Sequence, residues 1–153
     1  MSSSLVGKLS IGLLMSVVAT MPALGAGAGN IVGKWKTIDD ETGEPKSIVA
    51  IYEQNGKYFG RVESLFRTPD QDQDPVCDQC AEDDPRRNQK VRGMEIIQNM
   101  AFTGERWEGG TILDPANGKI YKCEIWLENG DLKVRGYIFF LFRTACKIWF
   151  WFT

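Results

Sequence analysis

The stretch that decides the fold is KIYKCEIWLENGDLKVRGYI, residues 119–138. Two apolar-rich runs meet there at Asn129-Gly130. Asn-Gly between such runs is the strongest short hairpin signal, because both residues accept the positive φ angles of a type I′ turn. A two-residue turn places Glu128 opposite Asp131, and this fixes every pair further along the two strands.

The two faces of this hairpin differ in polarity. Successive side chains of a strand point to opposite faces. The apolar face, expected to point to the core, consists of Cys123, Ile125, Leu127, Leu132 and Val134. The other face sets Glu124 opposite Arg135 and Trp126 opposite Lys133. Each such cross-strand pair stabilises a sheet by roughly 0.5 kcal/mol. We therefore predict this register.

Similar turn signals recur along the chain and predict an all-β protein. Asn55-Gly56 joins two apolar-rich runs, and Asp114-Pro115 and Asn117-Gly118 mark a further turn. The expected strands are 31–37, 47–54, 57–65, 94–102, 106–113, 119–127, 132–139 and 142–150. The segment 94–102 is too short for its periodicity to separate a strand from a short helix.

Eight short antiparallel strands favour a single closed barrel, which leaves no sheet edge exposed. The opening Gly33-Lys34-Trp35 is similar to the Gly-x-Trp that begins the first strand of lipocalin-like (calycin-like) barrels. In those barrels an arginine of the last strand packs over the tryptophan at the closed end, which implies this role for Arg143. Residues 67–92 are expected to form one long polar loop that carries two cysteines.

The first 28 residues differ from the rest and predict a cleaved signal peptide. Lys8 is their only charge, an apolar run covers residues 9–19, and the small residues 23–28 give an Ala-x-Ala-like exit. Cleavage is expected after Ala28, or after Gly25. A membrane anchor is the alternative, but the apolar run is shorter than the roughly 20 residues that cross a bilayer. We expect bacterial export to the periplasm or medium, and one barrel domain over residues 29–153.

Composition narrows the function. Without Lys8, the 18 basic and 20 acidic side chains of the chain leave a net charge of −3. This argues against a nucleic-acid partner, which requires a basic surface. The chain contains no histidine, which removes Ser-His-Asp and Cys-His catalysis and every zinc site that uses imidazole. We expect no cofactor and regard an enzyme as the less favoured class.

Four cysteines follow the predicted leader: Cys77, Cys80, Cys123 and Cys146. An oxidising compartment favours disulfides, and four cysteines allow three complete connectivities. A Cys77–Cys80 bond closes a small ring, whereas a bond from either to Cys123 would fasten the long loop to the barrel. The alternatives are a Cys₃ metal set completed by Cys146 or an aspartate, and a thioredoxin-type couple, which the acidic flanks disfavour because they raise thiol pKa values.

Acidic residues offer two further candidates. Asp70-x-Asp72-x-Asp74 begins like a calcium loop but has Pro75 where that loop needs glycine, so a solvated acidic loop is the preferred interpretation. Carboxylates available for acid–base work are Glu63, Asp114 and Glu124. Pairing with Arg135 and turn formation account better for the last two.

Four stretches taken in order resemble a known family: residues 33–62, 74–80, 109–126 and 132–137. They are similar to the small exported bacterial proteins of domain-of-unknown-function family 2147, whose activity is undetermined. The matching positions are Trp35, Asp39, Gly60, Cys77, Cys80, Gly93, Asp114, Pro115, Gly118, Tyr121, Cys123, Arg135 and Gly136. The end departs from the family pattern, since residues 148–152 form an apolar run that predicts self-association.

The favoured hypothesis is a binding module for a small apolar or amphipathic ligand, because small barrels can enclose one. The aromatic side chains proposed to line its site are Trp35, Tyr52, Phe59, Trp107 and Tyr121. The alternatives are an envelope interaction or structural protein without a ligand, and, less favoured, a thiol redox factor or enzyme. A packed interior with no pocket of roughly 300 Å³ would contradict the favoured hypothesis.

Overall fold

The computed structural model describes residues 30–39, 42–140 and 143–152, with 139–140 and 143–152 described by their backbone alone. The predicted signal peptide, residues 1–28, lies outside these ranges and stays a prediction. In the described part of the chain, no helix has the length and apolarity that crossing a bilayer would require.

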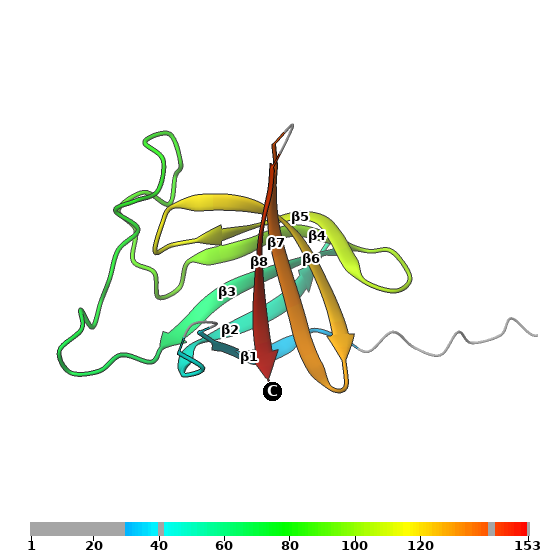
Figure 1. Ribbon diagram of the computed structural model, residues 1–153, viewed down its shortest axis with the longest axis horizontal. Helices are drawn as coiled ribbons and strands as arrows, with labels where there is room; N and C mark the ends of the chain where they lie inside the picture. The colour runs from blue at the N-terminus through cyan, green and yellow to red at the C-terminus, as the bar shows by residue number, and fades with distance from the viewer. Residues whose placement is uncertain (1–29, 40–41, 141–142, 153) are drawn as a thin grey trace, which may run out of the picture.

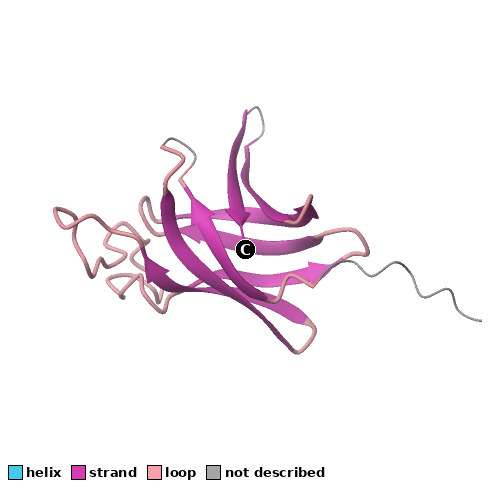
Figure 2. Ribbon diagram, turned by 90° about the horizontal axis from the view of Figure 1, so that it is seen from below, coloured by secondary structure: helices cyan, strands magenta, loops and turns pink. Residues whose placement is uncertain are grey.

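In the part of the chain that the structure describes, eight antiparallel strands in chain order form a closed barrel (Figure 1). They are β1 (Gly33–Ile38), β2 (Pro45–Gln54), β3 (Lys57–Leu65), β4 (Glu95–Phe102), β5 (Trp107–Asp114), β6 (Lys119–Glu128), β7 (Asp131–Phe140) and β8 (Arg143–Phe152). The predicted fold class is confirmed, and the segment left open between strand and helix is the strand β4. Figure 2 shows these strands curving around a common axis, with loops at their ends.

The hairpin of β6 and β7 has the predicted register. Glu128 pairs with Asp131, and the pairing continues through Glu124 opposite Arg135. Asn129 and Gly130 have φ angles of 54° and 90°, the left-handed values that a type I′ turn requires. The apolar face predicted for this hairpin is buried, apart from the partly buried Leu127.

One end of the barrel is closed by the segment before β1. Ile31 is fully buried, and the indole Nε1 of Trp35 donates a buried hydrogen bond of 2.8 Å to the Ile31 carbonyl oxygen. Because Trp35 belongs to β1, this bond ties the incoming segment to the first strand. Trp35 is therefore a buried core residue of β1.

The last strand corrects the expectation for Arg143. β8 meets β1 through the pairs Lys36–Phe152 and Thr37–Trp151, whereas Arg143 pairs with Phe140 at the other end of β8. Strands rise about 3.3 Å per residue, so the backbone of Arg143 lies roughly nine residues from the end of β8 that adjoins Trp35. The antiparallel return of the chain places Arg143 at the far end. Its side chain lies outside the described residues.

The loop between β3 and β4 contains a disulfide between Cys77 and Cys80, both fully buried. An isolated bridge pairs Val76 with Lys90. In Figure 1 this green loop extends beyond the ends of β3 and β4. It packs against the turn between β5 and β6, where a Cβ added to Gly118 (φ +67°) would lie 1.8 Å from the Gln79 carbonyl oxygen. This turn therefore requires glycine.

Candidate functional site

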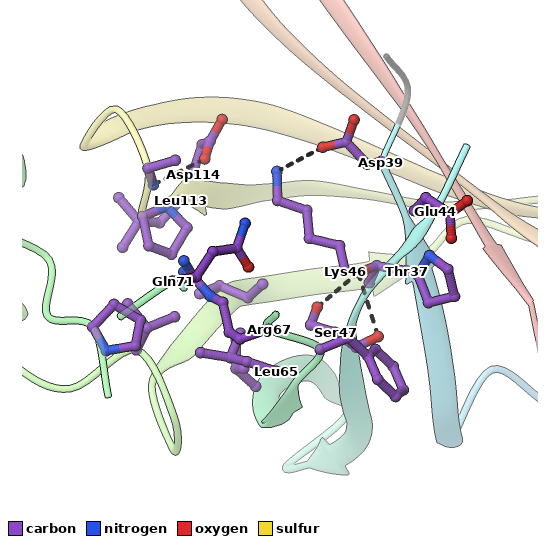
Figure 3. A pocket seen from close by; sticks show the side chains of 18 of the residues that line it. Thr37, Asp39, Glu44, Lys46, Ser47, Leu65, Arg67, Gln71, Leu113 and Asp114 are labelled. Carbon is purple, nitrogen blue, oxygen red and sulfur yellow. Dashed lines mark hydrogen bonds and ion pairs between the residues drawn. The ribbon is translucent and has the colours of Figure 1, made fainter. Parts of the chain in front are cut away.

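A cavity of about 690 Å³ opens at the end of the barrel opposite Ile31 (Figure 3). Its walls come from the ends of β1, β3 and β5, the start of β2, the β1–β2 loop and the long disulfide loop. Such a volume lies within the range of about 300–1,000 Å³ that holds small ligands. The mouth of the barrel therefore has a pocket larger than the roughly 300 Å³ that the ligand-binding hypothesis requires.

One wall of this cavity is polar and comes from β1, β2 and the loop between them. The hydroxyl oxygens of Thr37 and Ser47 lie 2.7 Å apart and form a hydrogen bond. Both residues are buried, with exposures of 6% and 7%. Both belong to the inward-facing rows of their strands, since Trp35 and Val49 are buried two positions away.

The rim of the polar wall is held in place by Asp39. One of its carboxylate oxygens accepts hydrogen bonds from the backbone N–H and the hydroxyl of Thr42, at 3.0 and 3.2 Å. Its other oxygen lies 3.4 Å from Nζ of Lys46. The loop is closed by the Asp39 backbone N–H donating to the Glu44 carbonyl oxygen. These bonds fix where the Lys46 ammonium lies above the hydroxyl pair (Figure 3).

The remaining walls are mainly aliphatic. The apolar side chains that line them include Val62, Leu65, Val91, Ile96, Ile112 and Leu113. All of these are buried except the partly buried Leu65. Aliphatic surface of this kind gains about 25 cal/mol for each Å² that a ligand removes from water.

The disulfide loop completes the rim. Val76 and Asp78, on either side of Cys77, both line the cavity. Phe66 and Val76 present apolar side chains at the rim that are 45% and 41% exposed. The bond between Cys77 and Cys80 closes a turn within the loop, and the burial of both cysteines shows that this part of the rim is packed.

Asp114 lies at the cavity edge and is 7% exposed. Its carboxylate accepts hydrogen bonds from the Ala116 backbone N–H and from Nδ2 of Asn117, each at 3.1 Å. The same Asn117 nitrogen lies 3.3 Å from the hydroxyl of Tyr121. Asp114 therefore organises the β5–β6 turn, as its Asp-Pro context predicted.

The aromatic residues proposed as ligand contacts are divided between two faces. Trp35, Trp107 and Tyr121 are buried and belong to the core. Tyr52 and Phe59 lie on the outer face, which corrects the expectation that they face the interior. The reason is the alternation of β2, in which Val49 and Ile51 occupy the inward positions, and Phe59 on β3 pairs with Tyr52. None of the five lines the mouth cavity, and their predicted role in ligand binding stays a prediction.

The outer-face aromatics form a cluster of their own. Tyr52 and Phe59 are stacked, with ring centroids 5.8 Å apart, and the Arg61 guanidinium lies 5.6 Å from the Tyr52 centroid. The Tyr52 hydroxyl donates a hydrogen bond to Glu95. Burial, together with Glu95, raises the pKa of Tyr52. A shallow hollow of about 390 Å³ adjoins this cluster and is lined in part by Arg61 and Arg92.

Among the three cysteines whose side chains are described, Cys77 and Cys80 are bonded to each other and Cys123 is a free, buried thiol. Burial, with a smaller effect of the neighbouring Glu124, raises the pKa of Cys123 well above its ordinary value. The fully buried disulfide and the protonated thiol favour a structural role. The fourth cysteine, Cys146, pairs with Tyr137 by its backbone, and its side chain lies outside the described residues.

The acidic candidates form local contacts. Residues 70–74 are exposed, and Asp74 lies 2.5 Å from Nζ of Lys90. Glu124 contacts Nη2 of Arg135 at 2.6 Å and Nη1 of Arg106 at 3.4 Å, which confirms the predicted pairing. In the ranges that the structure describes, no three His, Cys, Asp or Glu side chains form a group able to hold a metal ion. Glu63 forms an ion pair of 2.6 Å with Lys34.

Sequence reasoning missed the residues that build the cavity. Thr37 and Ser47 were available to it, because each is a polar residue at an inward position of an otherwise apolar row. A hydroxyl in such a row indicates either a buried hydrogen bond or a cavity. The aliphatic walls carried no comparable signal, since core residues have the same composition.

Comparison with known proteins gives one family and one fold. The sequence profile of a family described as "Uncharacterized protein conserved in bacteria (DUF2147)" matches residues 33–150. No curated protein matches the chain. A similar solved structure is that of protein HP1028 from Helicobacter pylori, described as belonging to the lipocalin family. It superimposes with a TM-score of 0.64 at 19% identity, over 80% of this chain and 81% of that one, which shows a lipocalin-like fold.

Proposed function

Since the chain belongs to the DUF2147 family of uncharacterised bacterial proteins, we propose its function from its own cavity: binding of a small amphipathic molecule at the mouth of the barrel. The observation that carries this proposal is the cavity of about 690 Å³ between the hydroxyl-bearing β1–β2 wall and the aliphatic walls of β3 to β5. A lipocalin-like fold is compatible with such binding.

The chemistry of the site supports binding more than catalysis. The polar groups of the mouth are held in local contacts, as in the Asp39–Lys46 pair and the Thr37–Ser47 hydroxyl pair. Aliphatic surface lies against them. An amphipathic ligand gains from both, because its apolar part leaves water and its polar part finds hydrogen-bond partners.

The proposal includes the place where the protein works. The first 28 residues have the composition of a signal peptide, and a buried disulfide suits an oxidising compartment. We propose that the mature protein binds its ligand in the periplasm or outside the cell. Amino-terminal sequencing of protein from the periplasmic fraction tests this, with a mature start near residue 29 expected and an intact leader on protein in the cytoplasm as the contrary result.

Binding is tested with N-phenyl-1-naphthylamine, an uncharged apolar dye whose fluorescence rises in apolar cavities. Wild-type protein is expected to bind it saturably at one site. Ala116 is exposed and lines the cavity, so Ala116→Trp adds bulk to the mouth and is expected to weaken binding about ten-fold, or by about 1.4 kcal/mol. Ala81 is exposed in the disulfide loop and does not line the cavity, which makes Ala81→Trp the matched control.

Two results would refute the proposal. One is the absence of saturable dye binding to folded wild-type protein. The other is equal binding by the Ala116→Trp and Ala81→Trp variants, because the dye would then occupy another part of the surface.

A further inference from the structure

The cavity has polar groups that reach far inside it, in addition to those at its rim. Thr37 and Ser47 are as buried as many core residues, while Asp39 and Lys46 stand above them at the opening. All four come from β1, β2 and their connecting loop. The aliphatic walls come from β3, β4, β5 and the disulfide loop. One side of the cavity is therefore polar along its depth and the rest is mainly apolar.

The hydroxyl pair keeps the capacity for one more hydrogen bond. Each hydroxyl has one proton to donate and two lone pairs that accept. The Thr37 oxygen lies 2.7 Å from the Ser47 hydroxyl oxygen and 3.4 Å from the Ser47 carbonyl oxygen. If Thr37 donates to the Ser47 hydroxyl, the Ser47 proton can be donated to a ligand. If Ser47 donates, lone pairs of Ser47 remain to accept from a ligand.

The charges of the mouth disfavour an anionic ligand. Four carboxylates line the cavity, those of Asp39, Glu44, Asp78 and Asp114, against the two cations Lys46 and Arg67. One of the cations, Lys46, already lies beside Asp39. An excess of like charge around a concave site repels an anion and lowers its affinity.

We propose that the ligand is an uncharged molecule with hydroxyl or amide groups along one edge and an apolar opposite face. This inference rests on the proposed function, because it assigns the chemistry of the ligand in the same cavity. The polar edge lies along Thr37 and Ser47, and the apolar face packs on the aliphatic walls. A fatty-acid-like molecule, with a flexible tail and an anionic head, matches neither the polar depth nor the charge of the mouth.

The test uses two uncharged probes with the same rigid skeleton, which compete with N-phenyl-1-naphthylamine. Cholamide carries two hydroxyl groups on one face of its steroid nucleus that lithocholamide lacks. Cholamide is expected to displace the dye at about five-fold lower concentration, as one added hydrogen bond in a buried site implies. Cholate, which replaces the amide by a carboxylate, is expected to bind about five-fold more weakly than cholamide.

The variant that tests the polar wall is Thr37→Val combined with Ser47→Ala. Replacing both partners of a hydrogen bond by apolar groups of similar shape leaves no buried group unsatisfied, so this variant is expected to fold. It should lose the preference for cholamide over lithocholamide, so that the two probes displace the dye at equal concentrations whatever the affinity of the variant for the dye. Ser64→Ala on β3, outside the cavity lining, removes a hydroxyl elsewhere and should keep the preference.

The outcomes separate the two proposals. Saturable dye binding with equal competition by cholamide and lithocholamide overturns the inference about the polar edge and leaves the proposed function standing. Cholate competing as well as cholamide overturns the inference about charge. Failure of the dye to bind, or dye binding that Ala116→Trp does not weaken, refutes the proposed function itself.

Discussion

Replacing Gly118 with alanine tests how the disulfide loop is held on the barrel. Gly118 has a φ angle of +67°, and a Cβ there would lie 1.8 Å from the Gln79 carbonyl oxygen and 2.6 Å from the Cys80 backbone nitrogen. These neighbours are backbone atoms next to a buried disulfide, so they cannot turn aside as a flexible side chain would. The loop must move away or the turn must distort.

The magnitude has two parts. An alanine in the left-handed region costs roughly 1–2 kcal/mol, and inserting a methyl group into a packed contact costs roughly 1–3 kcal/mol more. We therefore expect Gly118→Ala to lower the free energy of unfolding by about 2–5 kcal/mol. Urea denaturation followed by tryptophan fluorescence measures this quantity.

Gly56 supplies the matched control. Its φ angle of +73° is close to that of Gly118, but an added Cβ would meet no atom within 4 Å. Gly56→Ala therefore carries the backbone cost without the steric clash, and it should be the milder substitution by about 1–3 kcal/mol. If the two variants lose the same free energy of unfolding, the disulfide loop accommodates a side chain at position 118. The clash would then not destabilise the protein, and the reasoning is wrong.

Three further substitutions test other contacts. Trp35→Phe removes the donor to the buried Ile31 carbonyl oxygen and should lower the free energy of unfolding by about 1–3 kcal/mol; a thermal midpoint equal to that of wild type would contradict this. Raising the pH from about 8 to 10 should destabilise wild type by about 1.4 kcal/mol more than Cys123→Ala, because the thiol ionises past its ordinary pKa of 9.0 when unfolded but stays protonated when buried; parallel pH curves for the two proteins would refute it. The double variant Cys77→Ala/Cys80→Ala removes a small covalent ring and should unfold at lower urea, with a loss of about 2 kcal/mol; an unchanged midpoint would show that packing alone holds the loop.

Turn chemistry made the strands and one register predictable. Asn129-Gly130 predicts a two-residue turn, which fixes the register of β6 and β7. The opposite charges of Glu124 and Arg135 agree with that register. Asn55-Gly56 acts in the same way between β2 and β3. Local sequence is sufficient here because an antiparallel hairpin is a local structure.

The same reasoning did not place every side chain of β2. Ile48, Ala50 and Tyr52 alternate with Val49 and Ile51, so both faces of this strand are apolar and composition does not show which one points inward. The prediction that Tyr52 lines an interior site rests on its aromatic side chain and not on its position in this alternation. The structure resolves the ambiguity through burial, since both Val49 and Ile51 are buried.

The cavity was beyond local reasoning, because its walls join segments far apart in the chain. Thr37 and Ser47 meet Ile112 and Val91 only when the barrel is closed and the long loop is docked. The disulfide pairing could not be chosen locally either, because one alternative joined the loop cysteines to the distant Cys123. Cys123 is held in the core, whereas Cys77 and Cys80 are brought together by a turn within the loop.

The barrel has a seam where β1 meets β8 through Lys36–Phe152 and Thr37–Trp151, the two residue pairs that join these strands in the described residues. Local opening needs the least free energy where few backbone bonds must break, so within the described residues we expect it first at this seam. Thr37 belongs both to the seam and to the hydroxyl pair of the cavity. A ligand bound to that hydroxyl would stabilise the closed pairing of β1 with β8. Amide hydrogen exchange at Lys36 and Thr37 would therefore slow when the cavity is filled.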